Sequence, residues 1–235
     1  MASPSAPPPV KLICGILSAR SELLERARAE LAAHFGPLDV VSEIMDFDFT
    51  HYYDQEMGSP LLRQFVAFAD LVPPDVLVEA KHATNAMEEA FAARVPSVRG
   101  EGVPWFASLG DANHVGPQAP AEPDQARGER GLPTQRANHG TDRASTNGTG
   151  TPCRPVNLDP GYVDSPKLVL ASMKNFAHRV YLGRGVYGEV TLLHRRGRWT
   201  PLEWTFPDYA SGRYGPFLDQ AWRRLREQLA AEKIA

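Results

Sequence analysis

The sequence has little cysteine, no long apolar run and no strong excess of either charge. Only Cys14 and Cys153 occur among 235 residues, which excludes a disulfide scaffold and a four-cysteine zinc site. No stretch approaches the roughly 20 apolar residues that a membrane span needs. Lys and Arg total 25 against 28 Asp and Glu, a net charge of −3, so the composition disfavours nucleic acid as a partner. The first residues also show no basic, apolar signal sequence. Together with the lack of a long apolar run, this predicts a cytoplasmic protein with no membrane association.

Motifs that hold phosphate groups or activate nucleophiles are also missing. There is no Gly-x-x-x-x-Gly-Lys-Ser/Thr loop, no dinucleotide fingerprint after a strand, no His-Glu-x-x-His and no Gly-x-Ser-x-Gly. The glycines of Gly183–Gly185 belong to a predicted hairpin, not to a strand-to-helix turn. A P-loop nucleotide enzyme is therefore disfavoured.

Two segments lack the apolar residues that a core requires. Residues 1–9 include three consecutive prolines, and Val115 and Leu132 are the only large apolar residues between Asp111 and Pro152. Such segments cannot offset the backbone entropy of folding, about 1–2 kcal/mol per residue. We therefore predict a disordered leader over residues 1–9, a disordered insertion over residues 98–153, and one domain built from residues 10–97 and 154–235.

The remaining residues show strand and helix periodicities in a recognisable order. The first half predicts strand, helix, strand, strand, helix and strand, which is a ferredoxin-like pattern. The expected elements are a central strand at Val10–Ser18, a helix capped by Ser21 and ending at Gly36, a half-buried strand at Asp39–Phe49, a strand or helix at Arg63–Leu71, a helix at Asp75–Ala93, and a strand at Pro155–Val163 that runs into an Asp-Pro-Gly turn.

The second half predicts a hairpin and a closing helix. The expected elements are an apolar strand at Lys167–Met173, a hairpin of His178–Leu182 and Val186–Leu193, an edge strand at Trp199–Trp204 and an amphipathic helix at Tyr214–Ala231. The fold class expected is α+β: a mainly antiparallel sheet with helices packed on one face, ferredoxin-like in its first half, plus a C-terminal hairpin and helix.

Polar pairs at two-residue spacing recur on three predicted strands. Asp46 and Asp48, Asn157 and Asp159, and Glu189 and Thr191 would each lie on one face of a strand. If the three pairs share an open sheet face, their carboxylates would bind a divalent cation such as magnesium. The metal candidates are Asp46, Asp48, Asp159 and Glu189. The simpler alternatives are a solvent-facing edge for the first pair and a turn acceptor for Asp159.

Basic and aromatic residues supply the other candidates. Lys174, His178 and Arg179 form a Lys-x-x-x-His-Arg cluster that suits anion binding, although His178 could equally cap a strand. Glu189 lies among valines, and a buried carboxylate needs a partner. The catalytic candidates are His178, Lys174 and Glu189. The ligand-binding candidates are Tyr52, Tyr53, Asn157, Tyr162, Lys174 and Arg179.

Six phrases in a fixed order resemble those of one uncharacterised bacterial family. They are KLICGILSA, SEIMDFDFTHYYDQEMG, EAKHATNAMEEAFA, VNLDPGYV, KLVLASMKNFAHRVYLGRGVYGEVTL and EWTFPDY. The chain resembles domain-of-unknown-function family 4416 over about residues 10–97 and 154–232, and the family's members are shorter across the predicted insertion. The resemblance implies no established activity. Similar proteins are sometimes labelled GTP-binding, and this sequence has no phosphate loop to support that label.

Two functions follow from these candidates. The first is a non-catalytic module that binds a small anionic ligand or a protein partner on a polar sheet face, with the tyrosines as anchors. The alternative is a divalent-metal-dependent nucleotide or phosphoryl-group enzyme, in which carboxylates hold the cation and Lys174, His178 and Arg179 hold phosphate. The two differ in geometry, because only the enzyme requires Asp46 or Asp48 to converge with Asp159 or Glu189.

Overall fold

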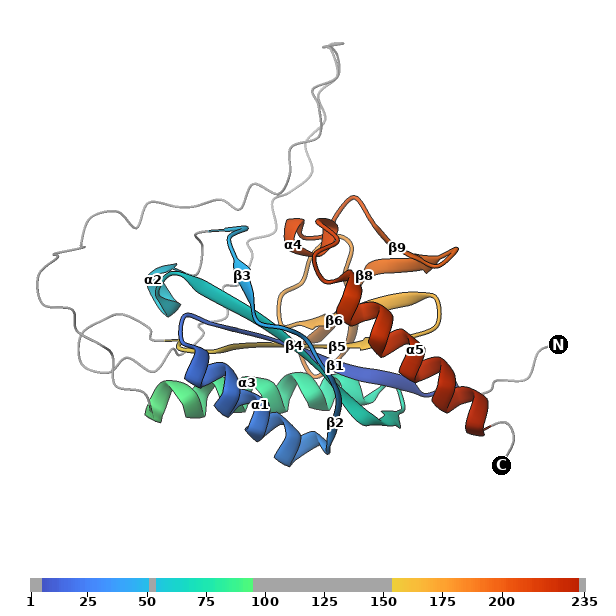
Figure 1. Ribbon diagram of the computed structural model, residues 1–235, viewed down its shortest axis with the longest axis horizontal. Coiled ribbons are helices and arrows are strands. Elements are labelled where there is room, and N and C mark those ends of the chain that lie inside the picture. The colour runs from blue at the N-terminus through green and yellow to red at the C-terminus, as the bar shows by residue number, and fades with distance from the viewer. Residues whose placement is uncertain (1–5, 51–53, 95–153, 233–235) are drawn as a thin grey trace, which may run out of the picture. The chain divides into compact units, whose positions relative to one another are not determined.

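The computed structural model describes residues 6–50, 54–94 and 154–232 (Figure 1). Contacts divide the chain into one unit of residues 1–97 and 153–235 and a second unit of residues 98–152. The second unit and most of the predicted leader lie outside the described residues. The predicted disorder of both segments therefore stays a prediction.

The first half forms a ferredoxin-like arrangement, as the sequence predicts. Its four main strands lie in the order β2-β4-β1-β5, and each neighbouring pair is antiparallel. The elements are β1 (Val10–Ser18), α1 (Ser21–Phe35), β2 (Leu38–Val41), β3 (Met45–Phe47), α2 (Asp54–Met57), β4 (Leu61–Val72), α3 (Val76–Arg94) and β5 (Asn157–Val163). The short β3 pairs with the beginning of β4.

The second half extends the same sheet beyond β5. The order continues β5-β6-β8-β7, with β9 paired to the C-terminal end of β8. Among the described residues the sheet therefore has nine strands, and β7 forms one of its edges. The elements are β6 (Lys167–Ser172), β7 (Val180–Gly183), β8 (Val186–Arg195), β9 (Arg198–Pro201), α4 (Pro207–Ala210) and α5 (Gly215–Glu232). The α+β class, the hairpin and the C-terminal helix are confirmed.

Helices lie on both faces of the sheet because strand residues alternate in direction. Leu12, Cys14 and Ile16 of β1 pack against α1 and α3, together with apolar residues of β4 and β5. Ile13 points the other way, into a second core that α5 closes. The two long helices of the first half thus share one face as predicted, and α5 covers part of the opposite face (Figure 1). None of the helices in the described residues is both long and apolar enough to cross a bilayer.

Three local predictions differ from the structure. The strand expected at Asp39–Phe49 is two strands, β2 and β3, separated where Ser42 bonds to both backbone groups of Phe65: its N–H donates to the Phe65 carbonyl at 2.9 Å and its Oγ accepts from the Phe65 N–H at 2.9 Å. The expected Asp-Pro-Gly turn lies inside β5. Pro160 has no N–H, and the pairing between β5 and β6 begins only at the next residue, Gly161, where a Cβ would lie 2.5 Å from the Val169 carbonyl oxygen. Finally, Arg20, not Ser21, is the N-cap of α1.

Candidate functional site

Side chains of α3 bond to the first half of β5, on the side where no strand of the described residues pairs with it. β6 pairs with β5 only from Gly161 onward. At Leu158, the carboxylate of Glu88 accepts the backbone N–H at 2.6 Å, and the ammonium of Lys81 donates to the carbonyl oxygen at 3.3 Å. Lys81 and Glu88 are seven residues apart, so they lie on one face of the helix. Both side chains therefore bond to the backbone of Leu158 in the way that a neighbouring strand would.

A buried guanidinium lies on the other face of the sheet, at Arg63 of β4. Its Nη1 donates to Asp159 Oδ2 at 3.0 Å, and its Nη2 lies 3.8 Å from Asp208 Oδ2 of α4. Asn157 Nδ2 donates to the same Asp159 oxygen at 2.7 Å. We call Arg63, Asn157, Asp159 and Asp208 the Arg63 centre. Gly15 of β1 makes room for it, since a Cβ there would lie 2.9 Å from Arg63 Nη1.

The charges of the Arg63 centre hold one another in place. Burial acts to raise the pKa of the Asp159 carboxyl, but the nearby Arg63 and Lys81 cations outweigh it and leave that pKa below its ordinary value. Burial raises the pKa of Asp208, and Arg63 offsets only part of that rise. The pKa of Arg63 stays above its ordinary value despite burial, because Asp159 and the neighbouring groups favour the cation. Arg63 is therefore a permanent cation that stabilises Asp159 as an anion.

Two polar atoms beside these ion pairs are buried without a hydrogen-bond partner in the described part of the chain. They are Arg63 Nε and the hydroxyl of Tyr209. The Tyr209 ring packs against Phe65 and Tyr214, with ring centroids 6.0 and 5.1 Å away. An unsatisfied buried group costs about 1–3 kcal/mol, so a water molecule or an acceptor group at this point would be favourable.

A second polar centre surrounds Glu189 of β8, which is almost fully buried. Arg179 Nε donates to Glu189 Oε2 at 2.6 Å, and His178 Nε2 lies 3.1 Å from the same oxygen. The His178 ring stacks on Trp204, with centroids 5.4 Å apart and planes 7° from parallel. Arg179 Nη1 also donates to Ser172 Oγ and to the Lys174 carbonyl, each at 2.9 Å. The structure thus brings His178, Arg179 and Glu189 together, and Glu189 has the cationic partner that its position in the sequence requires.

The four carboxylates proposed for a cation do not come together. Asp46 and Asp48 are exposed, and Arg213 Nη1 donates to the Asp46 carbonyl at 2.7 Å and to Asp48 Oδ1 at 2.8 Å. Asp159 lies on β5 and Glu189 on β8, and β6 lies between these strands. Their backbones are therefore two strand spacings apart, about 9.5 Å in total. Within residues 6–50, 54–94 and 154–232, no group of three or more His, Cys, Asp or Glu side chains could hold a metal ion.

The remaining sequence candidates are scattered. Tyr52 and Tyr53 lie outside the described residues. Tyr162 packs on the α3 side of the sheet near Leu77, opposite the Arg63 centre, and burial raises its pKa. Lys174 is exposed in the segment between β6 and β7. The proposed ligand set therefore does not form one site among the described residues.

Sequence reasoning missed Arg63 and Asp208, although both left a signal. Arg63 interrupts the apolar run of β4, and a charge in such a run needs a partner. Asp208 belongs to the EWTFPDY phrase, yet its role depends on α4 folding back over β4, where Arg63 lies. That contact joins residues far apart in the chain and has no local signature.

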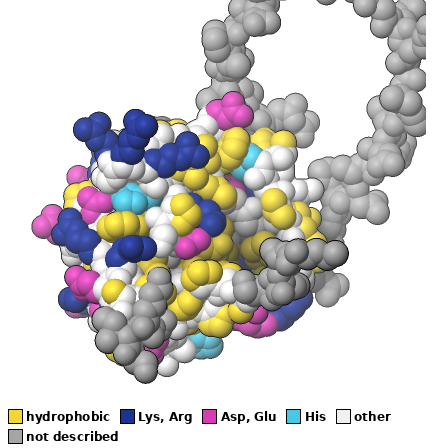
Figure 2. All heavy atoms as spheres, turned by 90° about the vertical axis from the view of Figure 1, so that its right-hand side faces the viewer, with side chains coloured by type: hydrophobic (Ala, Val, Ile, Leu, Met, Phe, Trp, Pro, Cys, Tyr) yellow, Lys and Arg dark blue, Asp and Glu magenta, His cyan; other side chains and the backbone are white. Residues whose placement is uncertain are grey.

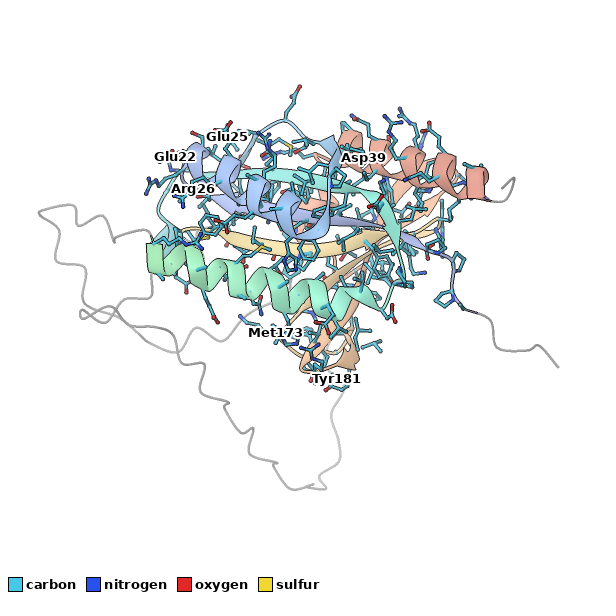
Figure 3. The ribbon with its side chains drawn as sticks, turned by 90° about the horizontal axis from the view of Figure 1, so that it is seen from below. Glu22, Glu25, Arg26, Asp39, Met173 and Tyr181 are labelled. Carbon is cyan, nitrogen blue, oxygen red and sulfur yellow. The ribbon has the colours of Figure 1, made fainter. Side chains whose placement is uncertain are left out.

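Among the residues that the structure describes, the largest group of exposed apolar side chains lies at the β7 edge. Five large apolar side chains there are 42% to 68% exposed: Met173, Phe176, Val180, Tyr181 and Leu182. We call them the β7 patch. Within the described sheet, β7 pairs with β8 on one side and with no strand on the other. Figure 3 shows Met173 and Tyr181 at the end of the sheet that lies away from α1, so this edge projects beyond the helical layers.

The fold and these centres define an α+β protein with a ferredoxin-like half extended by a four-stranded second half. The sequence model of one family, described as Domain of unknown function (DUF4416), matches residues 8–97 and 136–225. The chain belongs to this family, in agreement with the six phrases that resemble it. No curated protein and no solved structure matches the chain.

Proposed function

We propose that this protein is a non-catalytic binding module whose β7 patch takes up an extended segment of a partner protein as an additional strand. The observation that carries this proposal is the terminal position of β7 together with its exposed Val180, Tyr181 and Leu182. An edge strand presents unpaired backbone groups to other chains, and proteins normally protect such edges with charges, prolines or bulges. β7 itself carries no charge and no proline. Its pairing with β8 shifts register between Tyr181 and Gly183, so its regular edge is short.

The direction of the side chains supports strand addition. Val180 and Leu182 lie on one face of β7 and Tyr181 on the other, because successive strand residues alternate. All three are exposed, so apolar contacts are offered on both faces of the edge. An added strand would gain main-chain hydrogen bonds from the edge and side-chain contacts from both faces, which is the usual form of β-augmentation.

The charges near the patch indicate the chemistry of the partner. Lys174 is exposed and forms no ion pair with any described residue. Arg184, at the hairpin turn, is held by Glu79 but remains more than half exposed. A partner segment with an apolar centre and an acidic flank fits this edge best. A second copy of the chain would bring the same positive flanks together, which disfavours self-pairing.

The polar face supports the other functions less. A small anionic ligand there would meet charges that are already balanced: Asp159 is paired with Arg63, and Glu189 is paired with Arg179. The metal-dependent enzyme would need carboxylates that converge, and the four candidates lie apart. Catalysis retains one favourable feature, the His178 ring oriented by Glu189 and Trp204, since a carboxylate that orients a histidine is common at general bases.

The test is selection of peptides by the full chain. A random heptapeptide library displayed on phage is selected against the immobilised protein, and enriched sequences are synthesised and measured by fluorescence polarisation. We expect apolar, β-prone sequences with an acidic flank. Tyr181→Asp should weaken their binding at least tenfold, because hot-spot aromatics dominate such contacts. The matched control is Val41→Asp, which places the same charge on β2 at the opposite edge, where Val41 is 41% exposed.

Four results would overturn the proposal. The first is that no sequence is enriched. The second is equal binding by the wild type and Tyr181→Asp. The third is a dimer in sedimentation velocity that Tyr181→Asp dissociates, because the edge would then serve a second copy. The fourth is strong protection against hydrogen exchange, in the free protein, of the β7 amides that point away from β8, because another part of the chain would then already cover the edge.

A further inference from the structure

The tip of the β8–β9 hairpin displays three arginines. Arg195 pairs with Arg198 across a two-residue turn of Arg196 and Gly197, and all four residues are exposed. Both turn residues have positive φ angles, 51° at Arg196 and 74° at Gly197. Such turns favour Asn, Asp or Gly at the first position. The side chain of Arg196 is therefore not explained by the needs of the turn.

Two further arginines of α5 are held beside this tip by aromatic contacts. The His194 ring at the base of the turn lies 4.8 Å from Trp199 and 4.4 Å from Trp222 of α5, measured between centroids. Next to Trp222 on α5 are the exposed Arg223 and Arg226, and the guanidinium of Arg226 lies 5.8 Å from the Trp222 ring. We call Arg195, Arg196, Arg198, Arg223 and Arg226 the arginine patch.

No member of the arginine patch forms an ion pair within the described part of the chain. The exposed Arg20, Arg94 and Arg213, by contrast, pair with Glu22, Glu30 and Asp48. The nearby carboxylate of Asp219 accepts a hydrogen bond from Trp199 Nε1 at 3.0 Å. Figure 2 shows Lys and Arg side chains gathered in the upper part of the face that includes this hairpin.

We infer that the arginine patch binds the phosphate backbone of single-stranded nucleic acid. Guanidinium groups pair with phosphate in a planar, bidentate manner, which makes arginine the preferred residue for this ligand. The partly buried rings of Trp199 and Trp222 pack against the core and His194 beside the arginines, and the exposed part of such rings can stack with an unpaired base. The observation is independent of the β7 patch, so this inference goes beyond the proposed function.

An acidic membrane surface fits the arginine patch less well. The eight exposed large apolar residues of the described chain are Val41, Ile44, Met173, Phe176, Val180, Tyr181, Leu182 and Phe206. None lies in the hairpin tip or on α5. The apolar face of α5 is buried in the core through Phe217, Leu218 and Leu225, so the helix has nothing to insert between lipids.

The test measures polarisation of a fluorescein-labelled single-stranded oligouridylate with the full chain at several salt concentrations. If up to five phosphates are contacted, log K should fall with log salt at a slope of up to about −3.5. In the variant Arg195→Gln/Arg196→Asn/Arg198→Gln, asparagine is chosen at position 196 because it tolerates the positive φ of the turn. This variant should bind at least tenfold more weakly, with a slope smaller by about 2. Arg223→Gln/Arg226→Gln tests the helix separately and leaves the turn intact.

The control is Arg20→Gln/Arg28→Gln/Arg94→Gln, which removes the same charge from α1, its N-cap and α3. It should bind like the wild type. The inference is overturned if the oligouridylate does not bind at low salt, or if the two triple variants lose affinity equally. It is also overturned if phosphatidylserine vesicles bind through the patch and the oligouridylate does not.

Discussion

The Arg63 centre and the β7 patch differ in how far their groups are already satisfied. In the centre, a buried cation has carboxylates at 3.0 and 3.8 Å, and a neighbouring amide shares one of them. In the β7 patch, five apolar side chains face solvent on β7 and in the segment before it, and β7 has no strand on its outer side within the described sheet. In the first region the ion pairs are complete, and only Arg63 Nε and the Tyr209 hydroxyl lack a hydrogen-bond partner among the described residues. The second region would gain apolar burial and main-chain hydrogen bonds from a partner chain. The difference indicates that polar residues in strands can form ion pairs that stabilise the fold. A binding function is better supported by an exposed apolar edge such as the β7 patch.

Removal of the buried cation should have the largest effect on stability. Arg63→Met leaves Asp159 and Asp208 as carboxylates without their partner, and breaking a buried ion pair in this way costs about 4 kcal/mol. Urea unfolding at neutral pH measures the loss. Arg63→Met/Asp159→Asn should recover part of it, because one unpaired charge is removed. A loss below about 1 kcal/mol would show that the Arg63 centre does not stabilise the fold.

A second buried cation, Lys11 of β1, should show a similar but smaller effect. Its ammonium donates to Asp39 Oδ2 at 2.6 Å, to Gln228 Oε1 at 2.7 Å and to the Ala69 carbonyl at 3.0 Å. This network ties α5 to β1, β2 and β4. Asp39 is partly exposed, although its Oδ1 is buried without a hydrogen-bond partner among the described residues. Water can therefore solvate only part of its carboxylate in Lys11→Met, and the loss should be about 2–3 kcal/mol. Equal stability of Lys11→Met and the wild type in urea would contradict this.

The pH dependence of stability should separate Asp208 from Asp159. The pKa of Asp208 is raised in the folded state, so the native protein takes up this proton more readily than the unfolded chain does. Its contribution therefore becomes more favourable as the pH falls from neutral toward the ordinary aspartate pKa. The pKa of Asp159 is lowered, so its contribution is present at neutral pH and is lost below about pH 4.

Urea unfolding of the wild type and Asp208→Asn between pH 7 and pH 4.5 checks this prediction. The wild type should gain stability relative to Asp208→Asn as the pH falls. If the wild type instead loses stability relative to the variant over this range, the Asp208 carboxylate is stabilised by the fold and not opposed by burial.

The smallest effect on stability is expected at the β7 patch. Tyr181 is 59% exposed, and substitutions at such positions usually change the free energy of unfolding by less than about 0.5 kcal/mol. Tyr181→Asp should therefore unfold at the same urea concentration as the wild type. A loss of 2 kcal/mol or more would mean that the edge is packed against another part of the chain.

Local patterns in the sequence were sufficient for most of the fold. The apolar run of β1, the helical spacing after Ser21 and the glycines around Arg184 each determine an element through neighbours in the chain, and these elements are found. The exceptions depend on contacts between distant residues. Ser42 divides one expected strand because it bonds to Phe65 of β4, and Asp159-Pro160-Gly161 stays extended because β1 pairs with it on one side.

The candidate site was harder to predict from the sequence, again because it depends on contacts between residues far apart in the chain. The need of Glu189 for a cationic partner could be deduced from its apolar neighbours, and Arg179 supplies it. Two-residue spacing correctly placed Asn157 and Asp159 on one face, but it could not show that Arg63 from another strand neutralises that face. The net charge of −3 did not predict the arginine patch either. A chain of negative net charge can still have five arginines without ion pairs close together on one hairpin and one helix.

The comparison between the two regions is tested most directly by measuring the affinity of the selected peptide and the stability of the fold on the same two variants. Asp159→Asn should unfold at lower urea concentration and bind the peptide as the wild type does while folded. Tyr181→Asp should unfold as the wild type does and bind at least tenfold more weakly. The account is contradicted if folded Asp159→Asn loses peptide binding while Tyr181→Asp retains it, because the binding site would then lie on the polar face.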